Sequence, residues 1–377
     1  MIRDLTDDQA RLALPLKWGD VDPGVIPAWV AEMDFRLAEP VEEALVRTIR
    51  GGGAGYPPFG DRLGTTFAGF AERHWSWSVP AEASVATGSV MGGIRLALEA
   101  LCPPGPVVVP QPCYPPFRDV VAVTGRELLT VDLDPDAEVA TMDLGAIDAA
   151  FAAGGRTFLL CNPHNPLGRA WTGPELEALA EVARRYDVRV VSDEIHAPLT
   201  LPGATFTPYL TVDAAAVAVT SPSKAFNMPG VHGAQLVLLD PADRTRIRAL
   251  PVPAQNSWSS FGVVAGEVAW ADCDDWLAAL VERLTGNRDL LARLLAERLP
   301  QARMRPLEAT YLAWIDLRAY GVADPAAAAL GHGVRPAPGD HYQPGLDGHV
   351  RLNVATSAER VEQMVHRLAT ALTSGNS

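Results

Sequence analysis

The sequence contains almost no lysine. Of its 31 basic residues, only Lys17 and Lys224 are lysines, and the other 29 are arginines. A solvated surface charge is served by either residue, but arginine cannot replace an amine that must lose its proton, because guanidinium stays protonated in proteins. Lys224 is therefore a candidate functional residue before its neighbours are considered.

Other absences exclude whole classes of protein. No run of eighteen apolar residues is present, which predicts that no helix spans a membrane. The net charge of −14 repels nucleic acids and anionic membranes, so neither is an expected partner. The acidic first ten residues lack the apolar core of a secretory signal. The four cysteines form no C-x-x-C pair and the histidines no H-E-x-x-H motif, which predicts a cytoplasmic protein with reduced thiols and no metal site.

The 377 residues suffice for two packed domains, and the middle of the chain alternates short apolar runs with helical patterns. Nearly unbroken apolar strands separated by helices are typical of a largely parallel sheet with helices on both faces. The predicted strands are SVAT (84–87), VVV (107–109), FLLC (158–161), VRVVS (188–192), VAVT (217–220) and QLVLL (235–239).

The two ends of the chain have a different pattern. The first fifty residues read as an arm followed by a helix from Pro40 to about Arg50. After about residue 255 the pattern is mainly helical, with strand-like segments at 311–317 and 349–354. We predict an N-terminal arm and small-domain segment (1–45), a large cofactor-binding domain (46–255), and a connecting helix with a C-terminal small domain (256–377).

Three motifs follow consecutive predicted strands. They are CNPHNPLG (161–168), SDEIH (192–196) and SPSKAFNMPG (221–230). Loops at the carboxyl ends of parallel strands converge on one crevice, where open α/β sheets bind ligands. We therefore expect Asn165, Asp193 and Lys224 to lie together. An amide, a carboxylate and a lysine there suit a carbonyl-bearing, electron-accepting cofactor.

The order of these motifs resembles that of the fold-type I pyridoxal-phosphate enzymes, in the aminotransferase class I/II family. WVAEMDF (29–35), GYPPFG (55–60) and QPCYPPF (111–117) resemble its MalY/PatB branch, which holds cystathionine β-lyases and C–S lyases. The resemblance runs from about residue 15 to 370. It implies an α/β fold with a mostly parallel seven-stranded sheet covered by helices in a large domain. A smaller α/β domain would be formed by the C-terminus and the N-terminal arm.

The resemblance gives roles to residues in these motifs. Lys224 would bond to the pyridoxal aldehyde and then remove the substrate Cα proton. Asp193 would pair with the pyridine nitrogen and keep it protonated, since a nearby anion favours the charged form. Asn165 would donate to the phenolic oxygen of the cofactor and help to bind substrate. His196 either reaches the same edge of the ring or supports the site from behind.

The cofactor phosphate needs backbone amides at a helix N-terminus and hydroxyl groups. TGSVMGG (87–93) would supply the amides of Ser89 and Val90, and Ser221 and Ser223 would supply the hydroxyls. The family often has a basic residue eight positions after the Schiff-base lysine, and this sequence has His232 there. Either His232 binds phosphate or the other donors suffice.

Three further residues have roles implied by the resemblance. Tyr114 would stack on the face of the cofactor ring as part of the catalytic apparatus. Tyr56 would reach the phosphate of a neighbouring subunit, which implies a homodimer with shared active sites. Arg351, in the R-x-N segment of HVRLNV, would hold the substrate carboxylate through a fork of donors.

The implied reaction is β-elimination from an amino acid. L-cystathionine or another S-substituted L-cysteine would give a thiol, pyruvate and ammonia. The alternative is an aminotransferase, in which the proton returns to the aldehyde carbon of the cofactor and a keto acid accepts the amino group. A binding module without catalysis is a third reading, which the joint presence of Lys224, Asp193 and Arg351 disfavours.

Overall fold

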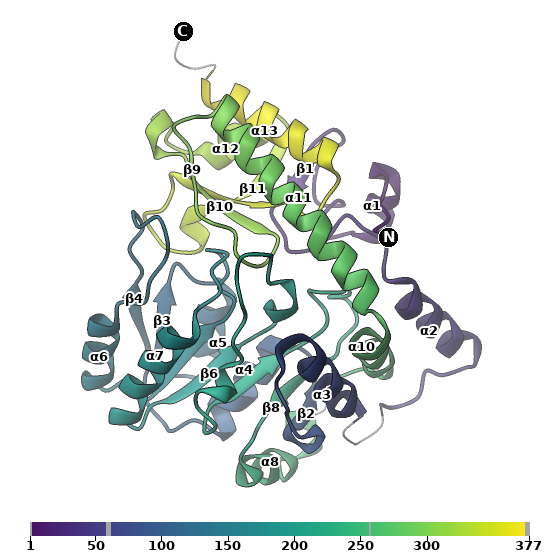
Figure 1. Cartoon of the computed structure of the whole chain (residues 1–377), viewed down its shortest axis with the longest axis vertical. Helices are drawn as coiled ribbons and strands as arrows, with labels where there is room; N and C mark the ends of the chain where they lie inside the picture. The colour runs from purple at the N-terminus through teal and green to yellow at the C-terminus, as the bar shows by residue number, and fades with distance from the viewer. Residues whose placement is uncertain (1, 58–61, 256–257, 374–377) are drawn as a thin grey trace.

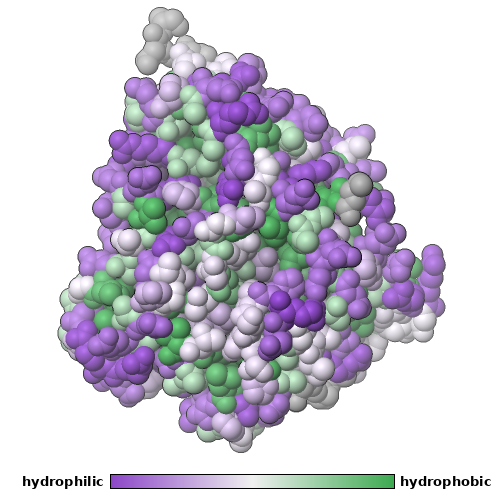
Figure 2. All heavy atoms as spheres, in the orientation of Figure 1, coloured by the Kyte–Doolittle hydropathy of each residue, from purple (hydrophilic) through white to green (hydrophobic). Residues whose placement is uncertain are grey.

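The computed structural model describes residues 2–57, 62–255 and 258–373. Its described residues form two sheets, and Figure 1 shows the larger sheet in the lower half of the molecule and the smaller sheet above it. Polar side chains cover most of the face seen in Figure 2, with small apolar patches between them. No helix among the described residues is long and apolar enough to cross a membrane.

The larger sheet has seven strands in the described residues, in the order β2-β8-β7-β6-β5-β3-β4. β8 is antiparallel to both of its neighbours, and the pairings among β7, β6, β5, β3 and β4 are parallel. The predicted mostly parallel sheet is confirmed. The bounds are β2 Ser84–Thr87, β3 Val107–Gln111, β4 Leu128–Asp132, β5 Thr157–Cys161, β6 Arg189–Asp193, β7 Val217–Thr220 and β8 Ala234–Val237.

Helices cover both faces of this sheet because successive strand residues point to opposite sides. Val107 and Val109 pack in one cluster with α4 and α5, whereas Val108 packs in the other with α6 and α7. The bounds of the large-domain helices are α3 Arg62–Trp75, α4 Val90–Ala100, α5 Pro116–Val123, α6 Leu144–Ala152, α7 Gly173–Arg185, α8 Pro241–Arg248, α9 Val252–Gln255 and α10 Ser260–Asp272.

The smaller sheet combines both ends of the chain. Its strand order is β1-β11-β12-β10-β9, and β1 pairs in parallel with β11, so the N-terminal arm completes a C-terminal sheet as predicted. The strands are β1 Ile26–Ala28, β9 Arg303–Met304, β10 Leu312–Asp316, β11 Val334–Pro338 and β12 His349–Asn353. The remaining α-helices are α1 Asp7–Ala13, α2 Glu39–Arg50, α11 Asp274–Arg298, α12 Pro325–Gly331 and α13 Ala358–Thr373. Short 3-10 helices span Ala81–Ala83, Ala197–Leu199, Tyr209–Thr211, Arg318–Tyr320 and Gly339–His341.

The two predicted domain boundaries do not coincide with loops of the described structure. The boundary between residues 45 and 46 falls inside α2, which packs against α10. The boundary at residue 256 lies outside the described residues. The three-segment division stays a prediction.

The segment of residues 29–35, called the strap here, passes between the two domains without pairing as a strand. Side chains therefore bind its backbone, because buried peptide groups require partners. Asn227 accepts from Met33 N and donates to the carbonyls of Met33 and Phe35, at 2.8, 2.8 and 3.0 Å. Asn353, on β12, donates to two more strap carbonyls, each at 2.7 Å. One amide from each domain thus clamps the strap.

Lys17 also binds the strap. Its side chain is fully buried, its Nζ lies 2.8 Å from Asp34 Oδ1, and it donates to Glu32 O at 2.9 Å. Trp18 Nε1 donates to the same Asp34 oxygen at 2.7 Å. Burial lowers the pKa of Lys17, and the Asp34 carboxylate opposes that change. Both lysines of the chain therefore lie inside the protein, where Lys17 has a structural role that the sequence did not indicate.

We expect Lys17→Met to reduce the free energy of unfolding by about 2–4 kcal/mol, because the buried Asp34 carboxylate loses its nearer cation and keeps only Arg360, at 3.6 Å. Urea unfolding of the two proteins measures the difference. The matched control is Arg3→Met, since Arg3 forms an exposed pair with Glu39 at 3.7 Å and its loss should cost less than about 1 kcal/mol. Equal unfolding midpoints for Lys17→Met and the parent protein would contradict this role.

Candidate active site

A cavity of about 400 Å³ lies at the carboxyl ends of β5, β6 and β7, against the smaller sheet. It collects residues from all three strand-end motifs and from both ends of the chain. Among the predicted site residues, those that line it are Ser89, Val90, Tyr114, Asn165, Asp193, His196, Ser221, Ser223, Lys224, His232 and Arg351. The strap contributes Trp29, Val30 and Ala31.

Asp193 is the last residue of β6 and is buried. Burial raises the pKa of its carboxyl group to about 7, although the N–H of Ile195, at 3.1 Å, and the charge of Lys224 oppose that rise. The carboxylate therefore lacks a strong countercharge within the protein. A positively charged N–H group placed against it would be stabilised.

Lys224 lies in the turn that follows β7, and its Nζ donates to Ala31 O of the strap at 2.8 Å. Burial and the charge of Arg351 lower the pKa of this amine to about 8, with Glu32 and Asp193 acting in the opposite direction. A substantial fraction of the amine is therefore neutral near physiological pH. A neutral amine is the form that attacks an aldehyde or takes up a proton.

Arg351, on β12, joins the small domain to the Asn165 loop. Its Nη1 donates to Asn165 Oδ1 at 2.9 Å and its Nη2 donates to Trp29 O, while the guanidinium lies 5.0 Å from the ring centroid of Tyr342. Its Nε is buried and has no partner within the described part of the chain. An unsatisfied donor on a buried cation favours an anionic ligand.

His196 is buried, and its Nδ1 has no partner among the described residues. Burial and the charges of Lys224 and Arg351 lower the pKa of its ring to about 3, so the imidazole is neutral. The edge of the ring contacts Tyr311 at 6.3 Å between centroids. Both roles considered for His196 remain compatible with this position.

The predicted phosphate residues gather at the start of α4. Ser89 caps this helix by accepting from Gly92 N at 3.0 Å, and the N–H groups of the first turn have no helical partner. Helix and sheet approach closely here, since a Cβ on Gly93 would lie 2.8 Å from Val219 Cγ1. The N-terminus of α4 therefore reaches the cavity wall.

Ser221 and Ser223, which flank Lys224 in sequence, line the same cavity as the start of α4. Ser221 Oγ donates to Gly233 O at 2.8 Å and lies 2.9 Å from Ser223 Oγ. His232 is exposed and also lines the cavity there. Its position is compatible with a phosphate ligand, and that role stays a prediction.

The two predicted tyrosines occupy different environments. Tyr114 lines the cavity, and burial together with the charge of Asp193 raises the pKa of its phenol, which is therefore neutral. Tyr56 is 96% exposed and does not line the cavity of its own chain. The rest of its GYPPFG motif, from Pro58 onward, lies outside the described residues.

Tyr342 is a site residue that the sequence did not indicate. Its ring lies against Arg351, and its carbonyl accepts from Cys113 N at 3.1 Å and from Arg118 Nη1 at 3.0 Å. These bonds fix a small-domain loop against the large domain at the cavity. The surrounding segment GDHYQPG has an ordinary loop composition, so no pattern marks it.

These features fit pyridoxal phosphate. The fitting groups are an amine of lowered pKa, a carboxylate without a strong countercharge, a helix N-terminus beside two serines, and two unpartnered polar atoms on Arg351 and His196. Lys224 would hold the aldehyde end, Asp193 the ring nitrogen, and the start of α4 the phosphate.

Comparison with known proteins gives a consistent result. The family model for aminotransferase class I and II matches residues 28–368. A cystathionine beta-lyase of Corynebacterium glutamicum is 32% identical to the chain and covers 95% of it and 96% of its own length. The cystathionine beta-lyase PatB of Bacillus subtilis is 33% identical, with 92% of each chain covered.

A solved structure from Corynebacterium diphtheriae superimposes with a TM-score of 0.94. It is provisionally named a PLP-dependent beta-cystathionase, is 32% identical to this chain, and the match covers 99% of both chains. The predicted fold class is confirmed.

The lowered pKa of Lys224 predicts the pH dependence of cofactor capture. Only the neutral amine attacks an aldehyde, so the rate at which cofactor-free protein binds pyridoxal phosphate covalently should rise with pH and reach half its maximum near pH 8. Stopped-flow absorbance measures this rate. The control is α-N-acetyl-lysine in solution, whose amine has a pKa of about 10.4. A protein profile that coincides with this control would contradict the lowered pKa.

Proposed function

Because the chain belongs to the aminotransferase class I and II family, we propose that it is a pyridoxal-phosphate-dependent carbon–sulfur β-lyase. Its substrate is L-cystathionine or a related S-substituted L-cysteine, and its products are a thiol, pyruvate and ammonia. The observation that carries this proposal is the meeting of Lys224, Asp193 and Arg351 in one cavity. The full-length relatives named cystathionine beta-lyase favour elimination over amino transfer.

Lys224 is the base of the reaction. When bound, pyridoxal phosphate supplies an aldehyde for the substrate amine and a protonated ring that accepts the electrons left at Cα. The neutral Nζ of Lys224 takes the Cα proton, and burial lowers its pKa enough for it to do so near neutral pH. Asp193 keeps the proton on the ring nitrogen through its negative charge.

Arg351 binds and orients the substrate. Its unpartnered Nε and its Nη2, which lie on the same side of the guanidinium, present a fork to the α-carboxylate, while Nη1 contacts the Asn165 amide at 2.9 Å. A fixed carboxylate places the Cα–H bond with respect to Lys224. The electron pair of that bond expels the thiolate from Cβ, and the enamine that remains hydrolyses to pyruvate and ammonia.

The assembled enzyme, in this proposal, is a cytoplasmic homodimer with shared sites. Val46, Ile49 and Tyr56 expose apolar side chains on α2 and the loop that follows it, which suits burial against a second copy. Tyr56 then contributes its hydroxyl to the phosphate site of the other subunit. The free cysteines are typical of a reducing compartment.

We expect Tyr56→Phe to weaken retention of pyridoxal phosphate about tenfold, because one charge-assisted hydrogen bond to phosphate is lost. Equilibrium dialysis of the dimeric protein measures the dissociation constant. Leu12→Ala is the matched control, since Leu12 is also exposed, at 87%, and lies on α1. The same dissociation constant in Tyr56→Phe and the parent protein would remove Tyr56 from the site.

The reaction itself is tested with L-cystathionine and no keto acid. Release of pyruvate and free thiol over many turnovers is the expected result, and Lys224→Ala should lose at least a thousandfold in turnover together with the absorbance band of the bound cofactor. Activity that appears only when a keto acid is added would establish an aminotransferase instead. Normal turnover in Lys224→Ala would contradict the assigned base.

A further inference from the structure

A second cavity, of about 420 Å³, lies beside the smaller sheet. Its described lining comes from the loop after β4 (residues 135–138), from residues 302–305, and from Trp314, Asp316 and His349 on β10 and β12. None of these residues lines the candidate active site. The second cavity is therefore a separate space that the proposed reaction does not use.

Two buried nitrogen atoms in this lining have no partner in the described residues. Arg305 is 9% exposed, and its Nη2 donates to Asp134 O at 2.7 Å, but its Nη1 is unpaired. His349 is 1% exposed, and its Nδ1 is also unpaired, while its Nε2 lies 3.9 Å from Asp316 Oδ1. Buried polar groups without partners are costly, and a guanidinium most of all, so acceptor oxygens are missing at the inner end of this cavity.

The rim of the cavity carries charges of both signs. Asp136 and Glu138 are exposed there, as is Arg303. Arg318 forms ion pairs with Asp136 and Asp316, at 2.5 and 2.7 Å. Glu138 is a third carboxylate at the rim, and Arg318 does not pair with it. A simple anion such as phosphate would meet these carboxylates, which repel it. A ligand with one negative and one positive group can pair its negative group with Arg305 and His349 at the inner end and its positive group with the carboxylates at the rim.

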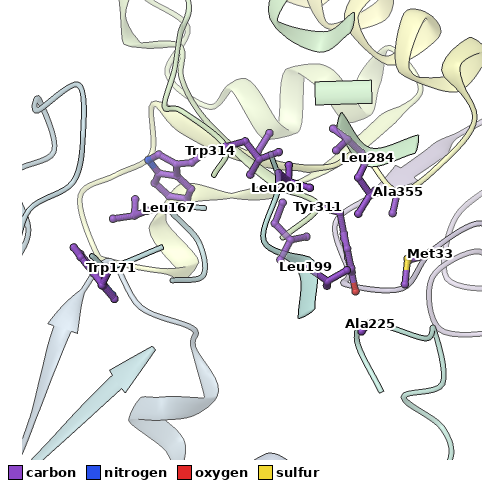
Figure 3. Close-up of a cluster of buried hydrophobic side chains, with 14 of the residues drawn as sticks. Met33, Leu167, Trp171, Leu199, Leu201, Ala225, Leu284, Tyr311, Trp314 and Ala355 are labelled. Atoms are coloured by element: carbon purple, nitrogen blue, oxygen red, sulfur yellow. The ribbon is translucent and has the colours of Figure 1, made fainter. Parts of the chain in front are cut away.

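The wall between the two ends is apolar. Trp314 is buried and stacks on His349 with ring centroids 5.4 Å apart, and Pro135, Ala137 and Ala302 also line the cavity. Figure 3 shows the Trp314 side chain above Leu167, in the cluster that joins the small domain to the large one. An aliphatic side chain fits against this wall.

We propose that the second cavity binds a free α-amino acid with an apolar side chain. The carboxylate contacts Arg305 Nη1 and His349 Nδ1, the ammonium group lies toward Glu138 and Asp136, and the side chain packs on Trp314. This site is independent of the proposed lyase function, since it contains none of the residues assigned to that reaction.

The probe is radiolabelled α-methyl-L-leucine, added to the protein loaded with pyridoxal phosphate. This amino acid has both charged groups and an isobutyl side chain, but it has no Cα hydrogen for Lys224 to remove. Equilibrium dialysis measures its binding. Arg305→Met should weaken binding at the second cavity at least tenfold, whereas Lys224→Ala, at a residue of the candidate active site that does not line this cavity, should retain it.

Two variants complete the test. Arg293→Met is the matched control, because Arg293 is an exposed arginine on α11 paired with Glu297 at 3.4 Å, and it should bind the probe as the parent does. Glu138→Gln changes an exposed residue and should weaken binding several-fold through loss of the partner of the ammonium group. Parent-like affinity in either Arg305→Met or Glu138→Gln would overturn the proposal, as would loss of all binding in Lys224→Ala.

The same dialysis distinguishes an amino acid from a plain anion. The parent protein should bind α-methyl-L-leucine more tightly than 4-methylpentanoate, which has the carboxylate and the isobutyl group but no ammonium group. Inorganic phosphate should not displace the probe at equal concentration. Tighter binding of 4-methylpentanoate, or displacement by phosphate, would overturn the assignment to amino acids.

Discussion

The backbone of the strap, residues 29–35, is the constraint on which the site depends. It crosses between the domains outside any strand, and only Asp34 and Phe35 at its end pair with the backbone of other segments, so its other buried peptide groups need side-chain partners. Lys224 and Arg351, the two cations of the site, donate to its carbonyls, and Asn227 and Asn353 fix it from opposite domains. The same hydrogen bonds that satisfy the buried backbone thus set the distance between Lys224 and Arg351, the proposed base and the proposed carboxylate ligand.

Burial gives this arrangement its chemistry. Burial lowers the pKa of Lys224 to about 8 and raises that of Asp193 to about 7. The two pKa values are therefore close, and the two groups do not form a fixed ion pair. Such a site is prepared for a ligand that brings a positive ring and a negative phosphate. The charge of Arg351 also lowers the pKa of Lys224, so an anion bound to Arg351, as proposed for the substrate carboxylate, would raise it.

Short, nearly unbroken apolar runs predicted six of the seven strands of the large sheet, and the strand-end motifs predicted the residues that line the cavity at its edge. The apolar runs missed β4, because Thr130 and Asp132 interrupt its apolar pattern and most of it is only partly buried. They were insufficient for β1 and β11, because Pro27, Pro336 and Pro338 lie within these strands and proline is unfavourable in strand patterns. Tyr342 and the second cavity were not predictable, since their neighbours come from segments far apart in sequence. The burial of Lys17 was equally hidden, because its partner Asp34 belongs to a loop.

Lys17 is fully buried in an ion pair, and Lys224, the other lysine, is half-buried at the wall of the candidate active-site cavity. The folded surface consequently offers no side-chain amine for acetylation, for ubiquitin-like conjugation or for amine-directed cross-linkers. A reagent that reaches a lysine of the native protein must enter the active-site cavity. Once the terminal amine is blocked, labelling of the native protein by an amine-reactive reagent therefore measures access to that cavity.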